Sequence, residues 1–139
     1  MRRIAFFSEH ASPVALLGGE DAGGQNVYVD RLSRGLADLG HRVDVFTRRD
    51  DPDAPEAIDW APGVRIVNLD AGPAKPLPKD ALWPLMPAFR DSLLRFAAAD
   101  GNRYDLLHGN FWMSGWAACE AGARFGLPVV QIFHATGIT

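Results

Sequence analysis

The sequence contains a single cysteine, Cys119, among its 139 residues. One thiol excludes an internal disulfide and a zinc site built from cysteine ligands. No apolar run reaches the roughly 18 residues that a membrane-spanning helix requires, and the start of the chain lacks the apolar stretch of a secretory signal. We therefore expect a cytoplasmic protein. The formal net charge of -3 offers no basic surface for nucleic acid, so nucleic-acid binding is not expected.

What the chain does contain is the ordinary content of a globular domain. Hydrophobic residues make up 47% and charged residues 22%, which suits one domain with a hydrophobic core. Short apolar runs alternate with segments of helical spacing along the whole chain, an order typical of an α/β fold around a parallel sheet. The predicted strands are 3–8, 42–47, 64–69, 104–108 and 127–133. The predicted helices are 23–39, 80–99 and 112–125, with loops at 9–22, 48–62 and 70–78.

Two details of the predicted helices can be checked directly. The first should pack through a stripe of apolar side chains at near-helical spacing, namely Val27, Leu32, Leu36 and Leu39. The second should be broken near its start, because Pro84 and Pro87 cannot donate a main-chain hydrogen bond.

Four glycines lie within residues 18–24, between the first predicted strand and the first predicted helix. Glycine allows a ligand to approach the backbone closely. A helix start also offers unpaired N–H groups and the positive end of the helix dipole. The segment therefore suits a phosphate or carboxylate, and it equally suits a flexible loop that simply precedes a helix.

Familiar nucleotide-binding patterns are absent around this loop. The fingerprint G-x-G-x-x-G does not occur, and no acidic residue ends the strand 42–47, which disfavours a dinucleotide site. A 2′-phosphate held by Arg48 and Arg49 is a weak alternative. Gln25 and Asn26 stand where a P-loop has its lysine and hydroxyl residue, so an ATPase is not expected.

Hydrolytic and metal sites also lack their signatures. No Gly-x-Ser-x-Gly turn is present, and the four histidines are scattered along the chain. Asp51-Pro52-Asp53 has the Asp-x-Asp form of some metal sites, but it lies in a predicted loop and reads as a solvated turn. No metal site is predicted.

Polar and aromatic residues follow three predicted strands at their carboxyl ends, where α/β sheets bind ligands. These groups are Glu9-His10 with the glycine loop, the segment 108–112, and His134-Ala135-Thr136. An imidazole at the position of His134 can donate a hydrogen bond or stabilise charge, or it can serve only the structure. The aromatic rings in the segment 108–112 could stack on a sugar or fill the core.

Three motifs carry a resemblance to a known family: Asp-Ala-Gly-Gly-Gln-Asn-Val-Tyr at 21–28, His-Gly-Asn-Phe-Trp-Met-Ser-Gly at 108–115, and His134. Together they resemble the amino-terminal domain of retaining glycosyltransferases of the GT-B fold. The subgroup is that of sucrose synthase, sucrose-phosphate synthase and the mycothiol-pathway glycosyltransferase. The resemblance covers essentially all 139 residues. It implies a three-layer, Rossmann-like parallel sheet that forms one half of a two-domain enzyme.

The resemblance also implies roles for individual residues. Gly23 and Gly24 would bring backbone N–H groups near the donor diphosphate, and Asn26 would lie on the acceptor side of the same loop. His134 would be the catalytic residue that contacts the donor sugar. Lys79 matches a lysine that binds the acceptor's phosphate, although an exposed loop lysine is an equal alternative. Acceptor contacts are also implied for the rim residues Asn110, Phe111 and Trp112.

Two departures from the family pattern lie where the acceptor would sit. Phe111 stands where many relatives have tyrosine, and Ala135 where they often have threonine or serine. The acceptor is therefore open, beyond being a small hydroxyl compound such as a sugar or sugar phosphate. The implied reactants are that acceptor and a nucleotide-sugar donor, with no metal or other cofactor.

In this family a carboxy-terminal domain holds most of the nucleotide, and nothing within residues 1–139 matches it. The resemblance implies that these residues are the acceptor-side domain, that they do not transfer sugar alone, and that their exposed cleft face favours self-association. Two other readings stay open. One is a stand-alone phosphosugar-binding module, and the other is a fragment of an NADP-type oxidoreductase.

Overall fold

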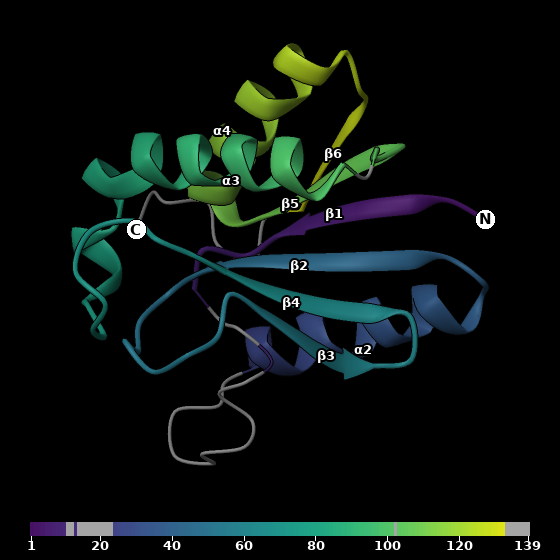
Figure 1. Cartoon of the computed structure of the whole chain (residues 1–139), viewed down its shortest axis with the longest axis horizontal. Helices are drawn as coiled ribbons and strands as arrows, with labels where there is room; N and C mark the ends of the chain where they lie inside the picture. The colour runs from purple at the N-terminus through teal and green to yellow at the C-terminus, as the bar shows by residue number, and fades with distance from the viewer. Residues whose placement is uncertain (11–12, 14–23, 102, 133–139) are drawn as a thin grey trace.

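The computed structural model describes residues 1–10, 13, 24–101 and 103–132, and the fold is shown in Figure 1. Within these residues a sheet of six strands runs in the order β3-β4-β2-β1-β5-β6. The strands are β1 (Arg3–Phe7), β2 (Arg42–Arg48), β3 (Ala57–Ala61), β4 (Val64–Leu69), β5 (Leu106–Asn110) and β6 (Val129–Ile132). The helices are α2 (Gly24–Asp38), α3 (Met86–Asp100) and α4 (Phe111–Phe125), with short 3-10 turns η1 (Lys79–Ala81) and η2 (Trp83–Leu85).

The sheet lies between two helical layers, with α2 on one face and α3 and α4 on the other (Figure 1). This arrangement confirms the predicted three-layer α/β fold. Strands β4, β2, β1, β5 and β6 pair in parallel, as predicted. Because the helices return the chain to the same end, all five parallel strands present their carboxyl ends at one edge of the sheet.

Strand β3 is the exception, because it pairs antiparallel to β4. It lies within the segment 48–62, for which the prediction of a loop was wrong. Pro55 and Pro62 flank the strand, and only five residues lie within it, so the apolar side chains of Ile58 and Trp60 gave too short a signal. The turn into β4 uses Gly63 at a φ of 78°, which glycine adopts without strain.

The smaller core lies between α2 and the sheet, where Phe6, Val43, Val45 and Ile66 of the strands meet the helix. The predicted stripe on α2 was only partly right. Leu32 and Leu36 do pack on the sheet, but Val27 is 36% exposed and Leu39 is 76% exposed. Tyr28 and Val29 take their place, because the helix ends at Asp38 and its inward face is rotated by one residue from the predicted one.

The larger core lies under α3 and α4. The inward residues predicted for the second helix are buried or half-buried there, and they include Met86, Phe89 and Leu93. The predicted break at its start is confirmed, since η1 and η2 precede α3 and Pro87 falls within the first turn of α3. Among the described residues, none of the helices is both long and apolar enough to cross a membrane.

Strand β5 ends two residues later than predicted, and α4 follows it with no loop between them. Residues 104 and 105 precede the strand, whereas Gly109 and Asn110 belong to it. The junction between Asn110 and Phe111 therefore lies directly at the carboxyl edge of the sheet, and it organises the site described next.

Candidate functional site

The junction between β5 and α4 is conformationally strained. Phe111 has a φ of 68°, in the left-handed region that side chains other than glycine seldom adopt. For a non-glycine residue this conformation costs about 1–2 kcal/mol. Such strain is maintained only where the surroundings enforce it, and it is commonest at functional sites.

Neighbouring polar groups hold this junction in place. The side chain of Gln131 in β6 donates from Nε2 to the backbone oxygen of Phe111 at 2.8 Å. On the other side, Asn110 Nδ2 donates to the backbone oxygen of Phe7 at 3.0 Å. The turn is thereby tied to the strands on both sides of β5.

Two glycines allow the helix to begin so close to the strand. A Cβ atom on Gly109 would lie 2.9 Å from the Cα of Gly115, a separation that real side chains do not reach. The side chain of Gln131 lies over the same two glycines, where a Cβ on either one would collide with its amide. Because both positions are glycine, α4 can pack this closely against the sheet.

Beside this junction, immediately after β1, lies the buried carboxylate of Glu9, which is only 2% exposed. Its Oε1 lies 2.8 Å from His10 Nδ1, and its Oε2 accepts a hydrogen bond from the hydroxyl of Ser114. The same hydroxyl oxygen accepts a hydrogen bond from the backbone N–H of Glu9 at 2.9 Å. Ser114 lies near the start of α4, so the helix dipole also favours a carboxylate there.

Glu9 in turn orients His10, and His10 covers Phe111. The imidazole and phenyl rings stack with their centres 4.1 Å apart and their planes at 25°. The ammonium of Lys79, in η1, lies 5.9 Å from the centre of the same phenyl ring. An imidazole and an ammonium from distant parts of the chain thus both lie near one buried aromatic ring.

This arrangement suits an anion that carries hydroxyl groups. Lys79 is exposed and contributes a positive charge and three donors. His10 is half-buried, and its Nδ1 is held by Glu9, so that its Nε2 is the nitrogen left to meet a ligand. Phe111 is only 1% exposed, so its ring supports these groups and offers no open surface on which a ligand could stack.

The other predicted site residues are more dispersed. Asn26 is buried in the first turn of α2, and Gly24 is the first residue of that helix. Asn110 is fully buried, with its amide bound to the backbone of β1. Trp112 packs against Trp83 of η2, with ring centres 4.8 Å apart, in an aromatic cluster that also includes Trp116.

The roles predicted for Gly23 and His134 fall outside the described residues. Within the described residues, no grouping of three histidine, cysteine, aspartate or glutamate side chains could hold a metal ion.

The two arginines after β2 have structural partners. Arg48 is buried and donates to the backbone oxygens of Ala71, Pro73 and Lys75, at 3.3, 2.8 and 2.6 Å. Burial lowers the pKa of Arg48, and the nearby Asp50 opposes that shift. Arg49 pairs with Asp70 at 2.8 Å. These contacts fix the segment that leads into η1 and Lys79, and they occupy the groups that a 2′-phosphate would need.

Sequence reasoning pointed to Glu9 and His10 only as unusual residues after a strand. It missed the contacts of Ser114 and Gln131 altogether. Both contacts join segments far apart in the chain, and nothing in the local sequence signals them.

Comparisons with known proteins show which family the chain and its fold resemble. The family described as "Glycosyl transferase 4-like domain" matches residues 23–139. The chain is 42% identical over 137 residues to D-inositol 3-phosphate glycosyltransferase 2 of Catenulispora acidiphila, covering 98% of this chain and 32% of that protein. It is 43% identical over 134 residues to D-inositol 3-phosphate glycosyltransferase of Acidothermus cellulolyticus, covering 96% and 30%.

Among solved structures, the sucrose-phosphate synthase of Thermosynechococcus elongatus superposes with a TM-score of 0.86 and 34% identity. The match covers 99% of this chain and 34% of that one. The chain therefore spans about a third of the length of the proteins that it resembles.

Proposed function

Because the chain belongs to the family of glycosyl transferase 4-like domains, we propose that it is the acceptor-side domain of a nucleotide-sugar-dependent glycosyltransferase. The enzyme would transfer a sugar to a hydroxyl group of a small phosphorylated acceptor. The observation that carries this proposal is that His10 and Lys79 both lie near the ring of Phe111 at the carboxyl edge of the sheet. Family membership also decides against the oxidoreductase alternative.

The acceptor we propose is a phosphorylated cyclic polyol of the inositol 3-phosphate kind. The names of the two relatives above support this class. Lys79 would bind the phosphate, and His10, oriented by Glu9, would add a hydrogen bond. Phenylalanine at position 111 lacks the hydroxyl of tyrosine, so the phosphate would depend on these two side chains.

The donor side of the proposal depends on residues to which the family resemblance assigns donor binding. Gly23 and Gly24 would present backbone N–H groups to the donor diphosphate at the start of α2, a position where helix ends favour anions. Asn26 would face the acceptor. His134 would contact the donor sugar and place it for transfer with retention of configuration.

We further propose that a second domain supplies most of the nucleotide site, as in the longer relatives. The chain alone would then bind the acceptor without transferring sugar. A cytoplasmic location and self-association through the carboxyl-edge face are also part of this proposal. Sedimentation velocity over a range of concentrations tests the self-association.

Titration of this chain with D-inositol 3-phosphate, followed by amide NMR signals, tests acceptor binding. We expect the signals of His10 and Lys79 to shift, and the variant K79Q to bind about tenfold more weakly through loss of a charge-assisted bond. The chain offers a matched control in Lys75, an exposed lysine of the preceding segment. K75Q should bind as the parent does, and unphosphorylated inositol should bind far more weakly.

Equal affinity of K79Q and the parent would contradict the proposed phosphate contact. Incubation of the chain with nucleotide sugars and inositol 3-phosphate tests the proposal that the chain alone does not transfer sugar. Transfer by the chain alone would overturn its proposed role as half of a site. Acceptor binding without transfer by a longer protein that contains both domains would favour a binding module instead.

A further inference from the structure

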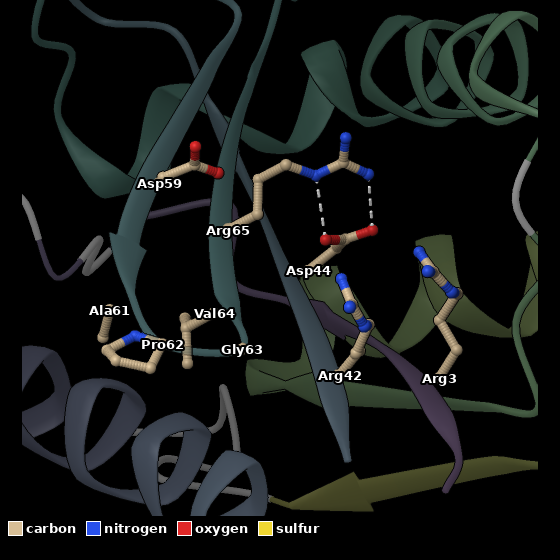
Figure 2. A pocket seen from close by; sticks show the side chains of 9 residues that line it. All are labelled: Arg3, Arg42, Asp44, Asp59, Ala61, Pro62, Gly63, Val64 and Arg65. Carbon is tan, nitrogen blue, oxygen red and sulfur yellow. Dashed lines mark hydrogen bonds and ion pairs between the residues drawn. The ribbon is translucent and has the colours of Figure 1, made fainter. Parts of the chain in front are cut away.

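A polar pocket opens at the amino edge of the sheet, the edge opposite to His10 and Lys79. It has a volume of about 600 Å³, within the range of small-molecule sites. Strands β1, β2, β3 and β4 contribute its lining, and Figure 2 shows the side chains. Its charged lining residues are Arg3, Arg42, Asp44, Asp59 and Arg65.

One wall of the pocket is an ion-pair network in which Arg65 is shared by two carboxylates, those of Asp44 and Asp100. Arg65 donates to both oxygens of Asp44, at 3.0 Å from Nε and 2.8 Å from Nη2, and its guanidinium also reaches Asp100 at 3.1 Å. The hydroxyl of Tyr104 donates to the same Asp44 carboxylate at 2.5 Å. The hydrogen bonds that Arg65 donates to Asp44 and Asp100 raise the pKa of its guanidinium. Both oxygens of Asp44 therefore accept hydrogen bonds within this network.

The other wall carries two arginines in adjacent positions. Arg3 of β1 and Arg42 of β2 are direct partners in the parallel register, so their side chains project from the same face of the sheet. Figure 2 shows both side chains extending from their strands toward the side of the pocket where Asp44 lies. Within the described part of the chain, neither side chain has an ion pair or hydrogen bond. Like charges directly opposite each other destabilise a sheet, so this pair favours an anion between its members.

From this geometry we propose that the pocket binds a phosphoryl group between Arg3 and Arg42. Guanidinium groups match the spacing of phosphate oxygens and bind them in bidentate fashion. Asp59 lines the opposite wall on β3, is exposed, and repels an anion, which places the phosphoryl group at the end formed by β1 and β2. The ligand is either inorganic phosphate or a small phosphate monoester.

Isothermal titration with sodium phosphate and with glycerol 3-phosphate, at ionic strength held constant with sodium chloride, tests the pocket. We expect R3Q/R42Q to bind at least about tenfold more weakly than the parent. D59N should bind more tightly, because it removes the repelling charge. R2Q is the matched control: Arg2 is exposed, adjoins the pocket and does not line it, so its loss should leave affinity unchanged.

The variant K79Q separates this pocket from the proposed acceptor site. Phosphate binding that survives in K79Q and is lost in R3Q/R42Q supports the amino-edge pocket, whatever becomes of the acceptor proposal. Tighter binding of the monoester identifies an organic phosphate as the ligand, and equal binding identifies inorganic phosphate.

Unchanged affinity in R3Q/R42Q overturns the inference, and so does an absence of binding by the parent. The double variant removes a repulsion, so it should unfold at the same denaturant concentration as the parent or a higher one. The Nε–H signals of Arg3 and Arg42, followed by NMR in the parent protein, give a readout that needs no variant. They should shift on addition of phosphate and stay unchanged with chloride.

Discussion

The imidazole of His10 lies flat on the ring of Phe111, with ring centres 4.1 Å apart. One residue follows the first strand of the sheet, and the other begins α4 in a left-handed conformation. The buried carboxylate of Glu9 fixes the imidazole, and the strained turn fixes the phenyl ring. The contact therefore depends on two separate restraints, and each of them can be measured.

The first prediction concerns the strain at Phe111. Both F111A and F111G lose a buried ring, at a cost of about 3–5 kcal/mol. Glycine relieves the left-handed backbone, so F111G should be more stable than F111A by about 1 kcal/mol. At an ordinary helical position alanine stabilises the protein more than glycine does. The control variant A98G in α3 should therefore lower the free energy of unfolding by up to about 1 kcal/mol. Urea unfolding of the three variants measures these differences, and an F111A that is more stable than F111G would contradict the strain.

The second prediction concerns Ser114. Its hydroxyl satisfies both the carboxylate and the backbone N–H of Glu9, so S114A leaves two buried polar groups without that partner. We expect a loss of about 1–3 kcal/mol in the free energy of unfolding. Ser33 is an equally buried serine whose hydroxyl donates to Val29 within its own helix. S33A should cost clearly less, and equal losses would count against a special role for the Glu9 contact.

The third prediction compares two helical glycines by replacement with alanine. At Gly35 in α2 an added Cβ would meet nothing within 4 Å, so G35A should raise stability by about 0.5–1 kcal/mol. At Gly115 the added Cβ would lie 2.6 Å from the side-chain amide carbon of Gln131. G115A should therefore lower stability by about 1–3 kcal/mol as that side chain is displaced. Thermal unfolding measures both, and a stabilised G115A would show that Gln131 moves without cost.

The fourth prediction concerns stability at alkaline pH. Burial, followed by the charge of Asp44, raises the pKa of Tyr104 above its ordinary value. Above about pH 10 the unfolded chain releases this proton and the folded chain keeps it, so the free energy of unfolding falls as pH rises. The contribution of Tyr104 to that slope is at most about 1.4 kcal/mol per pH unit. Y104F should show a shallower decline than the parent between pH 9 and 11 in urea unfolding, and parallel curves would contradict the assignment.

Five of the six strands and the helical layers could be predicted from the sequence, because apolar runs and helical spacing are local signals. Strand β3 could not, since a five-residue edge strand between prolines has the local composition of a loop. The exact start of α4 was also missed. Its first residue adopts a conformation that no propensity assigns to phenylalanine, and tertiary contacts of Asn110, Gln131 and the two glycines hold it.

The candidate site also has features that the sequence predicts and features that it does not. The resemblance predicted acceptor contacts for Phe111 and Lys79, and the structure places Lys79 and His10 near the ring of Phe111. The contact between Glu9 and Ser114 joins two elements that only the tertiary fold brings together, so no spacing rule could supply it. The roles predicted for Gly23 and His134 stay predictions, because these residues lie outside the described part of the chain.

The antiparallel strand β3 has a consequence for encounters between molecules. An open sheet edge is a template on which a second chain can add a strand, the first step toward fibrous aggregates. Here the edge beyond β4 is closed by a strand that is short, interrupted by a register shift between Asp59 and Ala61, and flanked by Pro55 and Pro62. The exposed carboxylates of Glu56 and Asp59 add like-charge repulsion between two such edges. Strand exchange between copies is therefore disfavoured along this side of the sheet.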